Sequence, residues 1–272
     1  MIKTLMHRVL PRRATETIYT VLLPFFRAEL PYLEFHVTDH CNMNCKGCFH
    51  YCPIASEHFA DLTQYTKDIR RLAQLFRNIT KIRIMGGEPL LHPDVAGFIT
   101  ASRSAFPLSN IHVVTNGTLL PKAPQAFWDA CKATNTDIHM SVYPPSQKRV
   151  ADYSRLCDSK GVRFQTKDMG IFYAHDNLSG DSSKEEAFDA CRKHFFCPFL
   201  QNGRLHVCFK PALIHYFNRQ FGISVPTDNG IDIHAFLATG KRIMEKLHSL
   251  LKPANGAHVM LYPTHGMWAA GF

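Results

Sequence analysis

Short apolar segments rich in β-branched residues alternate along the chain with segments whose apolar residues recur at helical spacing. Five of the short segments predict strands, at 33–37, 81–85, 111–115, 137–142 and 162–166. Four longer segments predict helices, at 62–77, 93–106, 124–133 and 147–160. This alternation is typical of βα units around a parallel sheet, so the sequence predicts an α/β fold of barrel type.

The length and composition predict a protein without a membrane span. The 272 residues are 46% hydrophobic, which is enough for one large core. Pro24 interrupts the apolar segment near the start, and no other run approaches the roughly 18 apolar residues of a spanning helix. Arg12, Arg13 and Glu16 are also unlike a signal peptide. We therefore expect a cytoplasmic protein.

The formal net charge of +9 limits the classes of partner. Such a charge suits nucleic acid, anionic lipid or a phosphorylated substrate. The Lys and Arg residues are scattered, however, and no helix-turn-helix or RNA-binding signature is present. The pattern argues against nucleic acid and favours a solvated basic surface or a small anionic substrate.

Motifs that carry chemistry follow the ends of the predicted strands. "TDHCNMNCKGC" follows the first strand, "GGEP" the second and "TNG" the third, while "SVYPP" ends the fourth. In a parallel βα barrel the loops after the strands share one mouth, so we expect these motifs to form one site.

The first of these motifs contains the spacing CxxxCxxC, formed by Cys41, Cys45 and Cys48. The cysteines of the chain are odd in number, clustered and without an export signal, which favours reduced thiols that bind a metal over disulfides. Three thiolates would leave one iron of a four-iron cluster open. With Cys52 they would instead suit a closed structural zinc site, and both interpretations fit these residues.

The order of the motifs resembles that of radical S-adenosylmethionine (radical SAM) enzymes, in which CxxxCxxC follows the first strand and a "GGEP" motif the second. The resemblance implies that residues 33–166 form the partial parallel (β/α)6 TIM-like barrel of that superfamily. It also implies a [4Fe–4S] cluster on Cys41, Cys45 and Cys48, whose open iron binds S-adenosylmethionine (SAM). The residues that it implies at the SAM site are Gly86, Gly87, Glu88, Pro89, Asn116 and Ser141.

By the same resemblance, the chain would cleave SAM reductively and form a 5′-deoxyadenosyl radical that abstracts hydrogen from a peptide, a sugar or another small molecule. An external electron donor such as flavodoxin or ferredoxin would be a partner. The reaction could be that of an oxidoreductase, an epimerase or a lyase. The alternatives are a non-catalytic zinc-binding interaction module and a radical SAM enzyme that modifies RNA.

The segment from 191 resembles the opening of a SPASM or twitch domain, which carries a further Fe–S cluster. Cys191, Cys197 and Cys208 are its candidate ligands, and "NGRLHVC" predicts a hairpin that would position Cys208. No cysteine follows Cys208, so the extension looks degenerate unless His258 or His265 completes the set. The expected domains are an N-terminal helical segment (1–30), a core barrel (31–180) and a C-terminal extension (181–272).

Overall fold

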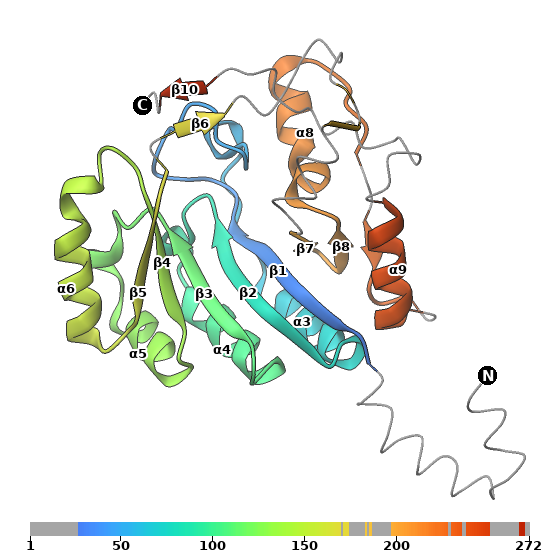
Figure 1. The fold of residues 1–272 in the computed structure, drawn as a ribbon, viewed down its shortest axis with the longest axis horizontal. Helices are drawn as coiled ribbons and strands as arrows, with labels where there is room; N and C mark the ends of the chain where they lie inside the picture. Colours follow the sequence, from blue (N-terminus) through green and yellow to red (C-terminus); the bar gives the residue numbers. More distant parts are fainter. Residues whose placement is uncertain are drawn as a thin grey trace, which may run out of the picture.

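The computed structural model describes residues 27–169, 171–173, 183, 185–186, 197–227, 230–235, 238–250 and 267–269. Its first half alternates strands and helices (Figure 1): β1 (Glu29–Thr38), α3 (Leu62–Leu75), β2 (Asn78–Gly86), α4 (Val95–Ala105), β3 (Asn110–Thr115), α5 (Gln125–Ala133), β4 (Asp137–Val142), α6 (Val150–Lys160) and β5 (Phe164–Asp168). These elements confirm the five predicted strands and the four predicted helices to within a few residues.

The second half contributes shorter elements. They are β6 (Ile171–Tyr173), β7 (Phe199–Gln201), β8 (Arg204–His206), α8 (Phe209–Phe221), β9 (Ile231–Asp232), α9 (Gly240–Leu250) and β10 (Met267–Ala269). Single turns of 3-10 helix lie at Cys52–Ile54, Pro89–Leu91, Leu120–Lys122 and Gln147–Arg149. No helix among the described residues is long and apolar enough to cross a membrane.

The strands form one twisted sheet in the order β5-β4-β3-β2-β1-β7-β8-β9. Strands β1–β5 are parallel, which confirms the predicted fold class. The sixth parallel strand is β7, which pairs with β1 although it comes from the segment assigned to the extension. Strand β6 pairs instead with β10 in a separate two-stranded sheet. The described part of the main sheet is open, with β5 and β9 at its edges.

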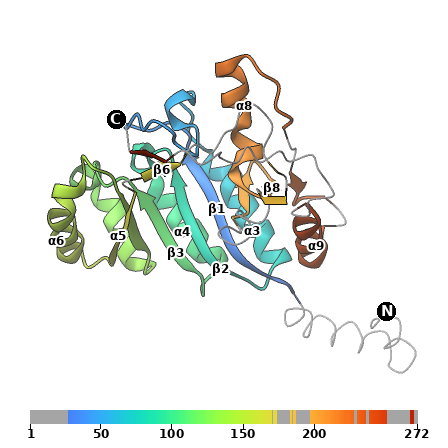
Figure 2. The same cartoon turned by 45° about the horizontal axis from the view of Figure 1, so that its top comes forward.

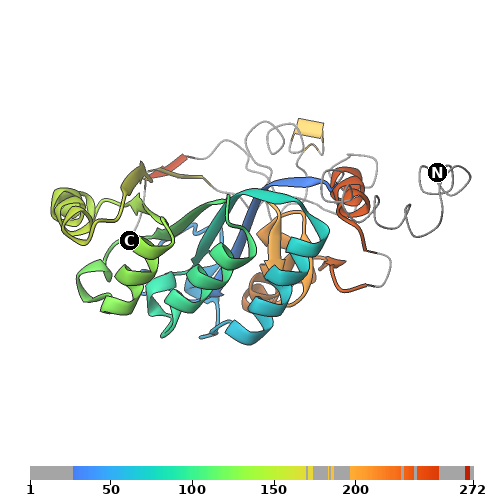
Figure 3. The ribbon, with the colours of Figure 1, turned by 90° about the horizontal axis from the view of Figure 1, so that it is seen from below.

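Helices α3–α5 cover one face of the sheet (Figure 3). Asp61 caps the start of helix α3, and its carboxylate accepts a hydrogen bond from the N–H of Gln64. Its apolar stripe packs on the sheet, where the ring of Tyr65 stacks on Phe35 at 4.1 Å between centroids. The fully buried side chains between the layers include Phe35, Phe76, Phe98, Phe127, Ile69 and Leu72.

The C-terminal part shares this core. The predicted hairpin is confirmed as β7 and β8, joined by Asn202 and Gly203 with φ of 46° and 74°, as a tight two-residue turn requires. Asp68 of α3 is buried and accepts hydrogen bonds from the N–H of Gly203 (2.7 Å), from Nε2 of His234 (2.7 Å) and from the amide of Gln64 (2.8 Å). The hydrogen bonds of this carboxylate therefore connect the β7–β8 hairpin to helix α3 of the barrel.

We expect Asp68→Ala to lower the free energy of unfolding by about 2 kcal/mol, because it leaves the buried N–H of Gly203 and the half-buried amide of Gln64 without an acceptor. Urea denaturation measures the loss. Asp129→Ala is the matched control, since Asp129 is exposed and accepts a single hydrogen bond, from Gln125. A loss no larger than that of the control would show that the hairpin is held mainly by its pairing with β1.

Residues 1–26 lie outside the described residues, as do most of those between 170 and 196. The predicted N-terminal helical segment therefore stays a prediction, although β1 begins at Glu29, inside its expected range. The proposed boundary between core and extension at 180/181 also lies outside the described residues.

Candidate active site

The four motifs meet at the carboxyl ends of β1–β4. The cysteine loop leaves β1 and lies above the ends of its neighbours (Figure 2). The "GGEP" loop follows β2, and the "TNG" turn follows β3. The parallel register of these strands brings all three loops to the same edge, as the sequence predicted.

The cysteine loop is compact and its thiols are partly withdrawn from water. Cys45 is buried, while Cys41 and Cys48 are half-buried. Burial raises the pKa of Cys41 to about 11 and that of Cys45 to about 12, and the neighbouring sulfurs act in the same direction. The Cys52 thiol donates a hydrogen bond to Cys48 and lowers the pKa of Cys48 to about 7.

The spacing of the sulfurs bears on which metal group they fit. Tetrahedral zinc with bonds of about 2.3 Å needs sulfurs about 3.8 Å apart. No three of the four loop cysteines place their sulfurs within 4.8 Å of one another. A [4Fe–4S] cluster accepts sulfurs that lie farther apart, because each thiolate binds a different iron. Three soft ligands on one loop thus fit the cluster better than a closed zinc site.

The "GGEP" loop packs directly on the backbone of the cysteine loop. The N–H of Gly87 donates to the carbonyl of Thr38 (2.8 Å), and that of Glu88 to the carbonyl of His40 (3.1 Å). A Cβ on Gly87 would lie 2.0 Å from the His40 carbonyl oxygen, so only glycine allows this approach. We had expected the two glycines to make room for a ligand, whereas Gly87 makes room for the loop that carries Cys41.

The Glu88 side chain has a different position from the expected one. It is fully buried, and its oxygens accept hydrogen bonds from the N–H of Asn116 (2.8 Å), the hydroxyl of Thr115 (2.7 Å) and the N–H of Leu90 (3.1 Å). Burial raises its pKa to about 7, against the effect of these donors. The carboxylate therefore joins the ends of β2 and β3.

We expect Glu88→Gln to lower the free energy of unfolding by about 1–3 kcal/mol, because one end of the amide must turn a donor toward a donor on Leu90, Thr115 or Asn116. SAM affinity should fall with it, as the loop loses its fixed shape. Denaturation of the variant without cofactors measures the first effect. A stable variant that binds SAM weakly would instead support direct contact between the carboxylate and the ligand ammonium.

Asn116 connects the third strand to the cysteine loop. Its side-chain amide donates to the oxygen of Asn42 (2.9 Å) and lies 3.7 Å from the sulfur of Cys41. Its carbonyl accepts from the backbone N–H and the hydroxyl of Thr118. The structure therefore places Asn116 beside Cys41 and Glu88, and Asn42 is a contact that sequence analysis missed.

Ser141 lies at the end of β4, half-buried. Its hydroxyl is hydrogen bonded to Tyr143, which sequence analysis also missed. Burial raises the pKa of Tyr143, and the thiols of Cys48, Cys45 and Cys41 add to this shift.

A buried network holds the start of the cysteine loop. Asp39 accepts from His36 (2.8 Å) and from the hydroxyl of Tyr216 on α8 (2.7 Å), and His36 is also bonded to His50 (2.9 Å). Burial opposes the charge on Asp39, yet the hydrogen bonds from His36, His58 and Tyr216 keep its pKa well below the usual range. The network ties the loop to the C-terminal part.

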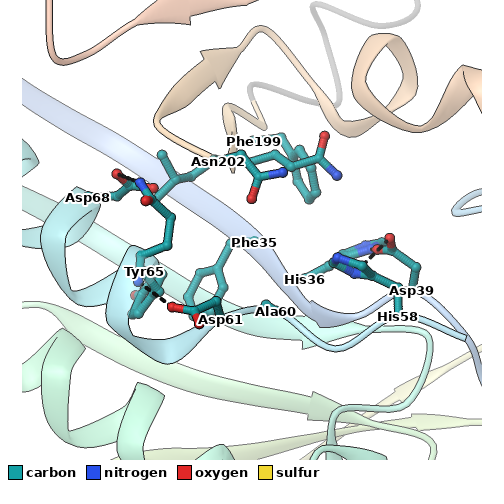
Figure 4. A pocket seen from close by; sticks show the side chains of 13 residues that line it. Phe35, His36, Asp39, His58, Ala60, Asp61, Tyr65, Asp68, Phe199 and Asn202 are labelled. Atoms are coloured by element: carbon teal, nitrogen blue, oxygen red, sulfur yellow. Dashed lines mark hydrogen bonds and ion pairs between the residues drawn. The ribbon is translucent and has the colours of Figure 1, made fainter.

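The same residues form one end of a small pocket between β1, α3 and β7 (Figure 4). His36, Asp39 and His58 lie at that end, and Asp68 and Asn202 lie toward the other. None of the loop cysteines lines this pocket, so it belongs to the joint between the barrel and the hairpin.

A family model agrees with this arrangement. The model of the radical SAM superfamily matches residues 35–178, more than half of the chain. The chain belongs to the radical SAM superfamily. Members of the superfamily use a [4Fe–4S] cluster and SAM for radical chemistry, so this radical SAM enzyme has these two cofactors. The alternative of a non-catalytic zinc module is thereby set aside.

Curated relatives match a short part of this radical SAM enzyme. "Molybdenum cofactor biosynthesis protein 1" of Bos taurus is 37% identical over 101 residues, which are 35% of this chain and 16% of the relative. "GTP 3′,8-cyclase" of Geobacter sulfurreducens is 33% identical over 103 residues, which are 37% of this chain and 31% of the relative. The matched segments span less than a third of either relative.

A solved structure supports the fold over a larger part of the chain. BtrN in complex with AdoMet and 2-DOIA has a TM-score of 0.51 and 12% sequence identity, and the alignment covers 87% of this chain and 93% of BtrN. At this identity the likeness concerns the fold alone.

The candidate ligands of a second cluster are partly described. Cys197 is half-buried and Cys208 is buried, and both flank the open end of the β7–β8 hairpin. Cys191, His258 and His265 lie outside the described residues. A second cluster in this radical SAM enzyme therefore stays a proposal.

Proposed function

We propose that Cys41, Cys45 and Cys48 hold the [4Fe–4S] cluster and that SAM binds beside it against residues 86–89, Asn116 and Ser141. Bound there, the cluster would supply the electron for reductive cleavage of SAM to methionine and a 5′-deoxyadenosyl radical. The substrate from which hydrogen would be abstracted is a peptide, a sugar or another small molecule.

The residues of the chain position and shield this chemistry. The backbone at Gly87 and Glu88 is fixed against the cysteine loop by two hydrogen bonds, so the cluster ligands and the SAM loop move as one unit. The Asn116 side chain lies 3.7 Å from the Cys41 sulfur, where it would help to exclude water from the site and so protect a reactive intermediate from side reactions.

The observation that carries the proposal is the contact of three motifs that are distant in sequence. The Asn116 side chain lies 3.7 Å from the Cys41 sulfur, while its backbone N–H donates to Glu88. A thiol ligand, the "GGEP" loop and the "TNG" turn are thus fixed to one another. Anaerobic reconstitution with iron and sulfide, followed by reduction with SAM and assay of 5′-deoxyadenosine, tests the proposal. Reconstituted protein that makes no 5′-deoxyadenosine would contradict it.

The partners follow from the chemistry. A low-potential electron must come from outside, for which flavodoxin or ferredoxin is suitable. The relatives named for GTP cyclisation and for molybdenum cofactor biosynthesis make a nucleotide-like substrate one candidate, and BtrN, solved with 2-DOIA, adds a second small molecule. RNA remains an alternative substrate, and salt-dependent RNA binding would distinguish it.

The net redox outcome depends on a second cluster. We expect a variant with Cys41, Cys45 and Cys48 all replaced by Ala to be free of iron after reconstitution, because too few soft ligands remain among Cys191, Cys197 and Cys208 for a closed site. Iron and sulfide analysis measures this. A variant that keeps about half of the wild-type iron with an Fe–S spectrum would contradict the expectation and favour an oxidative reaction over epimerisation or elimination.

A further inference from the structure

Three metal-ligating side chains meet on β3 and β4. They are His112, Asp137 and His139, and their ligand atoms all lie within 4.8 Å of one another. Among the described residues, no other three His, Cys, Asp or Glu side chains come together so closely. The register explains the meeting, because His112 is paired with Asp137, and His139 follows two positions later on the same side of β4.

This cluster is separate from the candidate active site. Val113 and Ile138, the neighbours of these residues along the strands, are fully buried in the core under the helices. The cluster therefore points to the opposite face of the sheet. His112 and His139 each lie three residues before the end of their strand, which is about 10 Å from the edge where the cysteine loop lies.

The two imidazoles are arranged as a pair of ligands. Nδ1 of His112 lies 2.6 Å from Nε2 of His139, so one N–H is shared between them. Burial lowers the pKa of His112 to about 4 and also lowers that of His139, so both rings are neutral at neutral pH, the form that binds a metal. An ion between the two nitrogens would replace the shared hydrogen bond, and its proton would move to the other nitrogen of the same ring.

The change that an ion requires is small. Zinc with bonds of about 2.0–2.1 Å to nitrogen needs the two nitrogens about 3.3 Å apart, so the rings would separate by roughly 0.7 Å. His139 is only half-buried, which leaves its ring free to make this adjustment. The geometry is therefore close to that of a bound ion.

Side chains at β5 hold two of the three ligands. The amide of Gln165 donates to Asp137 (3.3 Å), and the same side chain is hydrogen bonded to His139. Arg163, which precedes β5, also donates to Asp137 (2.7 Å). Histidines and carboxylates that bind metals are oriented by such additional hydrogen bonds. The cluster thus has the supporting contacts of a metal site as well as the ligands.

Nearby positive charge limits the kind of ion. Lys81 and Arg83 both act on His112 in the direction that lowers its pKa. The guanidinium of Arg83 is turned toward β1, where it donates to the hydroxyl of Tyr32 (3.0 Å), and Lys81 is exposed to solvent, which screens its charge. The remaining repulsion argues against Mg²⁺ and Ca²⁺, which prefer oxygen ligands, and favours the ions that imidazole binds.

We propose that His112, Asp137 and His139 bind one divalent transition-metal ion such as Zn²⁺, at a site separate from the [4Fe–4S] cluster. The ion joins β3 to β4. Three protein ligands leave a fourth position for water, as in zinc sites of the open type. The inference does not rest on the proposed function, because none of its ligands belongs to the four motifs.

Zinc binding to the cluster-loaded full chain tests the inference, because the cluster then occupies its own thiols. Anaerobic equilibrium dialysis against dilute Zn²⁺ is followed by zinc and iron analysis. We expect His112→Gln and His139→Gln each to carry one zinc fewer per chain than the wild type, with equal iron. Gln165→Leu should keep the site but weaken its Zn²⁺ affinity about tenfold to a hundredfold. His215→Gln is the matched control, since His215 is exposed on α8, toward the other edge of the sheet.

Equal zinc content in the wild type and both histidine variants would overturn the inference, as would a wild type that binds no zinc. Zn²⁺ should also raise the thermal midpoint of the wild type but not that of His139→Gln. If His112→Gln fails to fold, the half-buried His139 decides the matter alone. If the chain cannot be loaded with a cluster, the proposed function fails. The same comparison in a background with Cys41, Cys45 and Cys48 replaced by Ala still tests this site.

Discussion

Replacement of Cys41, Cys45 or Cys48 by Ala should each reduce 5′-deoxyadenosine formation to the background of protein without iron. Two thiolates cannot hold a four-iron cluster with a single iron left open for SAM. The three cysteines lie on one loop, and the next cysteine in the sequence is Cys52. No other thiol therefore has the CxxxCxxC spacing that would let it replace a lost ligand. Iron content, the visible spectrum and 5′-deoxyadenosine after anaerobic reduction are the measurements.

Cys52→Ala and Cys131→Ala are the controls for this series. Cys131 is buried in α5, so Cys131→Ala should lower the stability of the protein without changing its iron content. Cys52 donates a hydrogen bond to Cys48, so its loss should raise the pKa of Cys48 but leave iron in place. Loss of iron in Cys52→Ala as complete as in Cys48→Ala would make Cys52 a ligand and revise the assignment.

The sheet could be predicted from sequence because its strands are buried on the helical face. Ile82, Ile84 and Val113 are buried side chains that alternate with the polar residues Lys81, Arg83 and His112, and such a pattern has the period of a strand. The helices could be predicted equally well, since α3 has an apolar stripe and a capping aspartate. Local patterns of this kind are enough to place the loops at the carboxyl edge.

What could not be predicted depends on contacts between distant segments. Three residues of β7 are too short to signal a strand, and the partner strand β1 lies far away in sequence. The sequence also gave no reason to bury Glu88 under Asn116 or to connect Asp39 with Tyr216. Each of these polar groups is satisfied by a donor from another element, which only tertiary structure reveals.

These contacts have a common consequence for the site. Asp39 binds the start of the cysteine loop to α8, and Asp68 binds the β7–β8 hairpin to α3. The C-terminal part therefore supports the loop that carries Cys41, Cys45 and Cys48, the proposed cluster ligands. Truncation of this part would disturb the first site even in a protein with a single cluster.

The closest approach in the site is that of the "GGEP" loop to the cysteine loop, and Gly87→Ala tests it. A Cβ at this position would lie 2.0 Å from the carbonyl oxygen of His40, 2.3 Å from its carbon and 2.8 Å from the N–H nitrogen of Cys41. These are backbone atoms, which cannot turn away as a side chain can. The cysteine loop must shift, and we expect the free energy of unfolding to fall by about 2–3 kcal/mol.

The iron content of Gly87→Ala should fall as well, because Cys41 follows the displaced carbonyl of His40. The Cys41 sulfur would then move away from those of Cys45 and Cys48. Gly222→Ala is the control: it has positive φ and nothing within 4 Å of an added Cβ, so it should cost about 1 kcal/mol and leave the iron in place. Anaerobic reconstitution and denaturation of both variants measure the two effects. Full iron content and normal 5′-deoxyadenosine formation in Gly87→Ala would mean that the two loops separate without loss, and that cluster and SAM loop are not one rigid unit.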